Sequence, residues 1–134
     1  ILNTMIPVTA LFSSILFFLY FRLAKNVIAI RHKSKISLGF GKSKELEQAI
    51  SAHSNFNQYV PLALLMMACM ELNKIHFSLI ILIGTCFTFG RMVHAKSFLK
   101  KTMDIKQRVM GMKFTFYSMI AMAVLNIISF LIRI

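Results

Sequence analysis

The sequence predicts an all-α integral membrane protein, a bundle of four transmembrane helices in a single domain over residues 1–134. Three observations lead to this class. Apolar residues make up 57% of the chain, which is more than the roughly 45–50% of a soluble domain. Four apolar runs each approach the ~20 residues that a helix needs to cross a bilayer core about 30 Å thick. Charged residues are only 15% of the chain and lie near the ends of these runs.

The four runs cover residues 6–23, 49–72, 75–93 and 112–132. The first has no charge before Arg22, and the second begins polar and becomes fully apolar after Pro61. Arg91 and Lys113 lie inside the third and fourth runs, close enough to an end for a long side chain to reach the membrane surface. Each run is therefore expected to form one membrane-spanning helix.

The second helix has a recognisable start. The stretch SLGFGKSKELEQA, residues 37–49, contains two glycines, then Ser43, then two glutamates. A serine followed by acidic residues is typical of a helix N-terminus, because the hydroxyl accepts from a free amide and the carboxylates complement the helix dipole. The pattern predicts a turn and then a helix with Ser43 as its N-cap.

The charge distribution predicts an orientation. Sixteen Lys and Arg against four Asp and Glu give a net charge of +12, and fourteen of the sixteen lie in two connections, between the first and second runs and between the third and fourth. Positive connections face the cytoplasm, so we expect both long loops there, attracted to anionic lipids, and both termini on the opposite side. No basic groove interleaved with aromatic residues accompanies the charge, and nucleic acid is therefore not an expected partner.

The first half of the second run carries polar residues that share one helical face, at positions Gln48, Ser51, Asn55, Gln58 and Tyr59. Polar groups inside a membrane need a partner or a cavity. In an antiparallel bundle, Arg91, His94 and Arg108 come to the same depth, so positive charge would converge on this face. We expect it to bind an anionic small molecule from the cytoplasm. The alternative is that the amides only bond neighbouring helices and the arginines are ordinary interface charges.

Other chemistries lack the residues that they need. Cys69 and Cys86 both lie in apolar runs without the spacing of a metal site or a disulfide framework, and no metal is expected. No Asp or Glu lies in the middle of a span. A proton-coupled drug exporter, which titrates a buried carboxylate, is thus disfavoured.

Three segments together resemble a known family. The segment of residues 39–72, with AHSNFNQYVP at its centre, is followed by GRMVHA at residues 90–95 and by RVMGMKFT at residues 108–115. In this order they are similar to the MAPEG family, the membrane-associated proteins in eicosanoid and glutathione metabolism, and most similar to its small bacterial branch. The resemblance implies a left-handed four-helix bundle that assembles as a homotrimer, in a bacterial inner membrane, with a glutathione site between subunits.

The resemblance also implies roles for single residues. Asn55 and Tyr59 match residues that hold the glutathione backbone, and Arg31 is similar to an arginine that reaches a neighbouring subunit's ligand. Arg108 matches the arginine that stabilises the glutathione thiolate. A nearby cation lowers the pKa of a thiol and raises its nucleophilic fraction, so we predict Arg108 as the catalytic residue. The predicted residues that bind glutathione are Arg31, Ser51, Asn55, Gln58, Tyr59, Arg91 and His94.

The chain also departs from the family pattern. Gln48 and Ser51 replace arginines, Gln58 replaces a glutamate, and His94 and Phe98 stand where eukaryotic enzymes tend to have tyrosines. The leading hypothesis is a glutathione-dependent transferase or peroxidase for lipophilic electrophiles that arrive through the membrane. The departures favour a non-catalytic lipid-binding or scaffolding protein as the alternative, and a structural subunit held by its polar stripe is the third.

Overall fold

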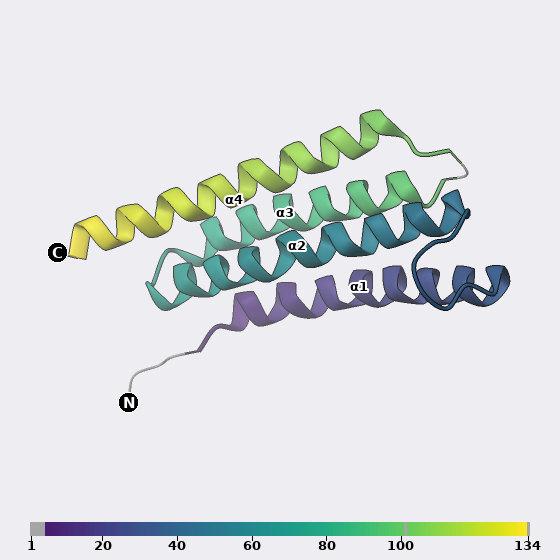
Figure 1. The fold of residues 1–134 in the computed structure, drawn as a ribbon. Coiled ribbons are helices and arrows are strands. Elements are labelled where there is room, and N and C mark those ends of the chain that lie inside the picture. The colour runs from purple at the N-terminus through teal and green to yellow at the C-terminus, as the bar shows by residue number, and fades with distance from the viewer. Residues whose placement is uncertain (1–4, 101, 134) are drawn as a thin grey trace.

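The structure is a computed structural model that describes residues 5–100 and 102–133. Its four α-helices follow one another in the order α1 (Pro7–Ser34), α2 (Lys44–Leu72), α3 (Phe77–Phe98) and α4 (Ile105–Arg133), and no strand occurs in these residues. Consecutive helices run in opposite directions (Figure 1). The α1–α2 and α3–α4 connections lie together at one end of the bundle, which we name the basic end, and the start of α1 and the end of α4 lie at the other.

The helices confirm the predicted elements but extend beyond the apolar runs. α1 continues past residue 23 to Ser34, and α4 begins at Ile105, well before residue 112. Hydropathy detects only the apolar part of a helix, whereas charged residues continue a helix into the water phase without difficulty. The charge distribution predicts that the two basic connections lie on one side of the membrane, and both connections do lie at the same end of the bundle.

Three helices, α1, α3 and α4, are long and apolar enough to cross a membrane. α2 falls outside that group because its first half is polar. It nevertheless contacts α1, α3 and α4, and its residues at 52, 56, 60, 63 and 67 are buried against them. α2 shares this central position with α3, which also contacts the three other helices, and the polar half of α2 is partly covered by protein.

The start of α1 is fixed by a residue from the end of α2. The amides of Val8 and Thr9 each donate to the Glu71 carboxylate, at 2.8 Å to Oε1 and 2.8 Å to Oε2 respectively. The first amides of a helix have no partner within the helix, and Pro7 at the first position has no N–H. Glu71 therefore provides acceptors for the amides that α1 leaves free, and a negative charge at the positive end of the helix dipole.

The start of α2 agrees with the sequence prediction. The Ser43 hydroxyl accepts from the Leu46 amide at 3.2 Å. Gly39 and Gly41 have φ angles of +63° and +56°, which residues with a Cβ adopt only with strain. These two glycines let the chain turn back from α1 into α2.

α3 and α4 pack with their backbones in contact near the basic end. A Cβ on Gly111 would lie 2.6 Å from the His94 amide nitrogen, and a Cβ on Gly90 would lie 2.9 Å from the Gly111 carbonyl oxygen. Small residues permit such close approach between helices in membranes. The contact sets the distance between α3 and α4 at the level of Arg91 and His94.

The outer surface of the bundle is apolar. Phe18 on α1 is 71% exposed and Tyr117 and Ile132 on α4 are 69% and 78% exposed. Monomeric soluble proteins rarely expose continuous apolar surfaces of this kind. The exposed apolar side chains therefore indicate that this surface contacts the lipid of a membrane.

Candidate functional site

The guanidinium of Arg91 lies inside the bundle. Arg91 is 1% exposed, and its Nη2 donates to Asn55 Oδ1 at 2.6 Å and to His94 Nδ1 at 3.2 Å. Nη1 lies 3.4 Å from the Thr115 hydroxyl oxygen, and that hydroxyl in turn donates to the Gly111 carbonyl at 2.9 Å. One side chain thus joins α2, α3 and α4 at a single depth.

Aromatic and sulfur groups complete the surroundings of the guanidinium. Its carbon lies 5.7 Å from the centre of the Tyr59 ring, which meets Phe116 edge to face. Met112 places its sulfur 3.8 Å from Nη1. A ring at this distance stabilises a cation through its negative face. Asn55, Tyr59, Arg91, His94 and Thr115 are called the Arg91 cluster below.

No carboxylate of the described residues pairs with the positive charge of the cluster. Within residues 5–100 and 102–133 the ion pairs are Lys33–Glu45 and Lys100–Asp104, and neither of them includes Arg91. The Arg91 Nε also has no hydrogen-bond partner in that part of the chain. A buried cation surrounded only by neutral groups favours an anion nearby.

His94 adds a second donor. A guanidinium can only donate, so the Nδ1 atom that faces Arg91 accepts, and the ring proton is assigned to Nε2. His94 is 1% exposed, and its Nε2 has no partner among the described residues. Two buried N–H groups of the cluster, at Arg91 Nε and His94 Nε2, therefore have no hydrogen-bond partner among the described residues.

Arg108 occupies a different position from Arg91. It is exposed on the first turn of α4, with its guanidinium carbon 5.3 Å from the centre of the Phe98 ring and Nη1 3.8 Å from the Met103 sulfur. The Phe98 ring lies 5.2 Å from the His94 ring. The two arginines predicted to approach the polar face thus differ in position. Arg91 donates directly to Asn55 on that face, whereas Arg108 lies over the Phe98 ring at the edge of the cluster.

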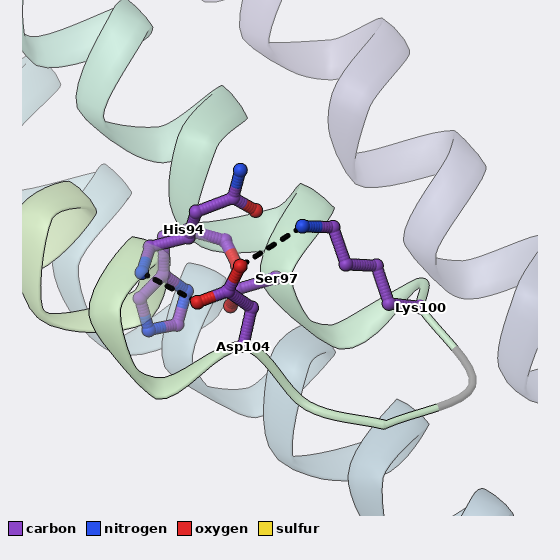
Figure 2. Close-up of polar contacts among 5 residues, drawn as sticks. His94, Ser97, Lys100 and Asp104 are labelled. Carbon is purple, nitrogen blue, oxygen red and sulfur yellow. Dashed lines mark hydrogen bonds and ion pairs between the residues drawn. The ribbon is translucent and has the colours of Figure 1, made fainter.

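The α3–α4 connection determines where Arg108 lies. The Asp104 amide donates to the Ser97 carbonyl at 3.2 Å, and the Arg108 amide donates to the Asp104 carbonyl at 3.0 Å. Figure 2 shows the Asp104 carboxylate between the Lys100 side chain and the first turn of α4. Lys100 donates to it at 2.9 Å and the Gln107 amide at 3.1 Å. These bonds, that from Lys100 first, hold the pKa of Asp104 below its ordinary value.

The remaining predicted residues lie outside the cluster. Ser51 and Gln58 are exposed on α2, and the Ser51 hydroxyl donates to the Glu47 carbonyl at 2.8 Å. Gln48 lines a separate cleft. Arg31 donates to the Gly39 carbonyl at 2.8 Å and to two further carbonyls of the α1–α2 connection. Within one chain, Arg31 thus holds its own loop.

Sequence reasoning missed Thr115 as a member of the cluster. Its position was detectable, because Arg108, Gly111 and Thr115 follow one another at spacings of three and four, which places them along one face of α4. It is one of only a few polar residues in the apolar part of that helix. Its hydroxyl supplies Arg91 with an oxygen partner from α4.

The fold and the cluster together define a helical membrane protein that keeps a buried arginine in the interior of its bundle. The chain belongs to the MAPEG family, whose family model matches residues 9–128. That family is one of four-helix membrane bundles, in agreement with the fold. The resemblance predicted from the motifs is therefore confirmed.

Two curated relatives are bacterial. The protein named inner membrane protein YecN from Escherichia coli K12 is 27% identical over 120 residues, which is 90% of this chain and 90% of the relative. The YecN of Escherichia coli O6:H1 matches with the same identity and coverage. The similarity therefore extends over nearly the whole of each chain.

Proposed function

We propose that this protein is a glutathione-dependent transferase or peroxidase that acts on lipophilic electrophiles reaching it through the membrane. The membrane is a bacterial inner membrane, as the name of the YecN relatives suggests, and the basic end faces the cytoplasm. Glutathione enters from the cytoplasm, and the electrophile enters from the lipid.

The observation that carries the proposal is the burial of Arg91, which bonds Asn55 at 2.6 Å and forms no ion pair with any residue that the structure describes. A buried charge is retained only where something compensates for its desolvation. An anionic peptide lying against α2 supplies that compensation, since the Asn55 amide and the Tyr59 phenol can bond its backbone. Glutathione is an anionic peptide of suitable polarity.

The chemistry requires no nucleophile from the protein. A free thiol with a pKa of about 8.5 is mostly protonated at neutral pH, and a nearby cation shifts it towards the thiolate. Arg108, exposed at the edge of the cluster, is the proposed cation for this step. The thiol proton passes to water, the thiolate sulfur forms a bond to the electrophilic carbon, and the leaving group departs with its electron pair.

We further propose that the functional unit is a homotrimer in which the site is completed by a neighbouring subunit. Ser51 and Gln58 are exposed on α2 beside Asn55, so a ligand held there would also face the next chain. Both residues are neutral where the family has charges. The loss of charge-assisted bonds worth about 1.5–3 kcal/mol each predicts binding of glutathione in the millimolar range.

The test is a turnover assay on the purified protein in detergent. With millimolar glutathione and 1-chloro-2,4-dinitrobenzene, or with a lipid hydroperoxide, we expect turnover. Arg108→Ala should lower the rate by about a hundredfold, the size of a lost electrostatic contact to a developing or reacting anion. Arg22→Ala removes an exposed arginine from α1 and should leave the rate unchanged.

A parallel titration measures binding separately from catalysis. Glutathione should raise the midpoint of thermal unfolding, and the rise should be lost in Asn55→Leu. The absence of both turnover and a thermal shift would contradict the proposal and leave the non-catalytic lipid-binding protein as the better description. A thermal shift without turnover would retain the binding site and remove the enzyme.

A further inference from the structure

The cleft lined by Gln48 lies at the basic end, between α1, the start of α2 and the end of α3. Its volume is about 540 Å³, and its lining shares no residue with the Arg91 cluster. Asn26 contributes from α1, Gln48 from α2 and Leu99 from the residue after α3. Of the polar face on α2 only Gln48 lines this cleft, and none of the residues predicted to bind glutathione does, so the occupant of the cleft is a separate question.

The lining of this cleft divides into an apolar floor and a cationic rim. The floor contains Ile30, Ala49 and Phe98, which are 8%, 3% and 8% exposed. The rim consists of three lysines whose side chains reach the solvent, Lys33, Lys44 and Lys100. A ligand for such a cleft has an anionic group for the rim and apolar groups for the floor.

The rim lysines remain able to bind an added anion. Lys33 lies 3.5 Å from Glu45, and Lys100 lies 2.9 Å from Asp104. Both pairs are partly or largely exposed, and exposed pairs contribute little to stability, so a phosphate can share or replace these carboxylates. Lys44 makes no ion pair with any described residue. Since Glu45 is the one acidic residue in the lining, the cleft keeps a positive charge.

The position of the cleft along the bundle matches the headgroup region of a bilayer. On α1, Lys25 lies over the Phe21 ring at 5.6 Å, the geometry of a lysine that extends from apolar surface towards water. Ile30 and Lys33 lie one to two turns further on. α3 reaches the same end, with its apolar residues ending at Leu99 and Lys100 following. Basic residues at this depth attract anionic lipids.

We propose that this cleft binds the headgroup of an acidic phospholipid. The lysines of the rim hold the phosphate, and the first carbons of the lipid lie over the floor formed by Ile30, Ala49 and Phe98. A soluble phosphate ester would share the charge chemistry but would leave that floor uncovered. The apolar floor and the depth of the cleft therefore favour a lipid.

The experiment uses lipid-stripped protein in a neutral detergent, with bound lipid counted by native mass spectrometry. Phosphatidylglycerol is the probe and phosphatidylcholine is the neutral reference. The variant K33Q/K44Q/K100Q removes the rim. The matched control, K42Q/K96Q/K106Q, removes the same charge from exposed lysines outside the cleft. Circular dichroism and gel filtration verify the fold, and if the triple variant does not fold, Lys44→Gln is compared with Lys42→Gln.

We expect one saturable binding site for phosphatidylglycerol per chain. The affinity for this lipid should fall by about tenfold or more in the rim variant and by less than about twofold in the control, because each basic residue near an anionic lipid contributes to binding. Equal losses in both variants would overturn the site, because they would reflect net charge alone. Equal binding of phosphatidylcholine would also overturn it. Glycerol phosphate that displaces the lipid at comparable concentration would overturn the lipid assignment and show that the occupant is a soluble phosphate ester.

Discussion

Glu71 connects the end of α2 to the start of α1, and replacing it should destabilise the bundle measurably. Its two carboxylate oxygens accept from the Val8 and Thr9 amides, both at 2.8 Å. In Glu71→Gln the side-chain amide keeps one acceptor, and its NH₂ group is forced to face the other backbone N–H. One charge-assisted bond is lost and one donor is left without a partner.

The magnitude follows from these two bonds. Hydrogen bonds to a charged group contribute about 1.5–3 kcal/mol each, so Glu71→Gln should lower the free energy of unfolding by about 1.5–3 kcal/mol and Glu71→Ala by up to about 3–6 kcal/mol. Glu47→Gln is the matched control, because Glu47 lies on the same helix and is exposed. Its loss from the first turn of α2 should change stability by less than about 1 kcal/mol.

The assay is unfolding in detergent by increasing mole fractions of sodium dodecyl sulfate, followed by circular dichroism. Labelling of the two half-buried free thiols, Cys69 and Cys86, gives a second signal for unfolding. Hydrogen exchange at Val8 and Thr9 should accelerate in both Glu71 variants. If Glu71→Gln and Glu47→Gln unfold together, or if exchange at these amides stays unchanged, the start of α1 does not depend on the Glu71 carboxylate.

Two further predictions concern the joint between α3 and α4. Gly111→Ala places a methyl group 2.6 Å from the His94 amide nitrogen. Because the backbone of α3 cannot move away there, the variant should lose about 1–3 kcal/mol of stability in the same unfolding assay. An unchanged midpoint of unfolding would contradict the close packing of α3 and α4. Asp104 has a lowered pKa, so its contribution to stability is complete above the unfolded value of about 3.9 and disappears as the pH falls through the folded value. Asp104→Asn should therefore flatten the acid side of a pH–stability profile, and a profile that falls as steeply as the parent's would exclude this role.

The helices themselves could be predicted from the sequence because each depends on local properties. The four apolar runs identify the cores of the four helices, and Ser43 with Gly39 and Gly41 marks the start of α2. The two basic connections share one end because antiparallel helices with short turns leave no other arrangement. Hydropathy, charge and capping each act over only a few neighbouring positions. The helices that depend on them can therefore be deduced from the order of residues alone.

The candidate site could be predicted only in part. The sequence indicates a polar stripe on α2 and three cationic or imidazole groups at the same depth. It does not distinguish Arg91, which becomes 1% exposed and bonds Asn55, from Arg108, which stays exposed over Phe98. That difference depends on how α3 and α4 are rotated about their axes.

The tertiary structure alone decided three features: the union of Asn55, Arg91 and Thr115, the backbone contact at Gly111, and the bond from Val8 to Glu71 across 63 positions. Each depends on the relative rotation and translation of two or more helices. Those parameters come from the packing of whole helix faces against one another, and a periodic pattern within one segment contains no information about the face that its neighbour will present. The sequence by itself determined the elements, their order and the charge of each end, whereas packing determined which side chains meet.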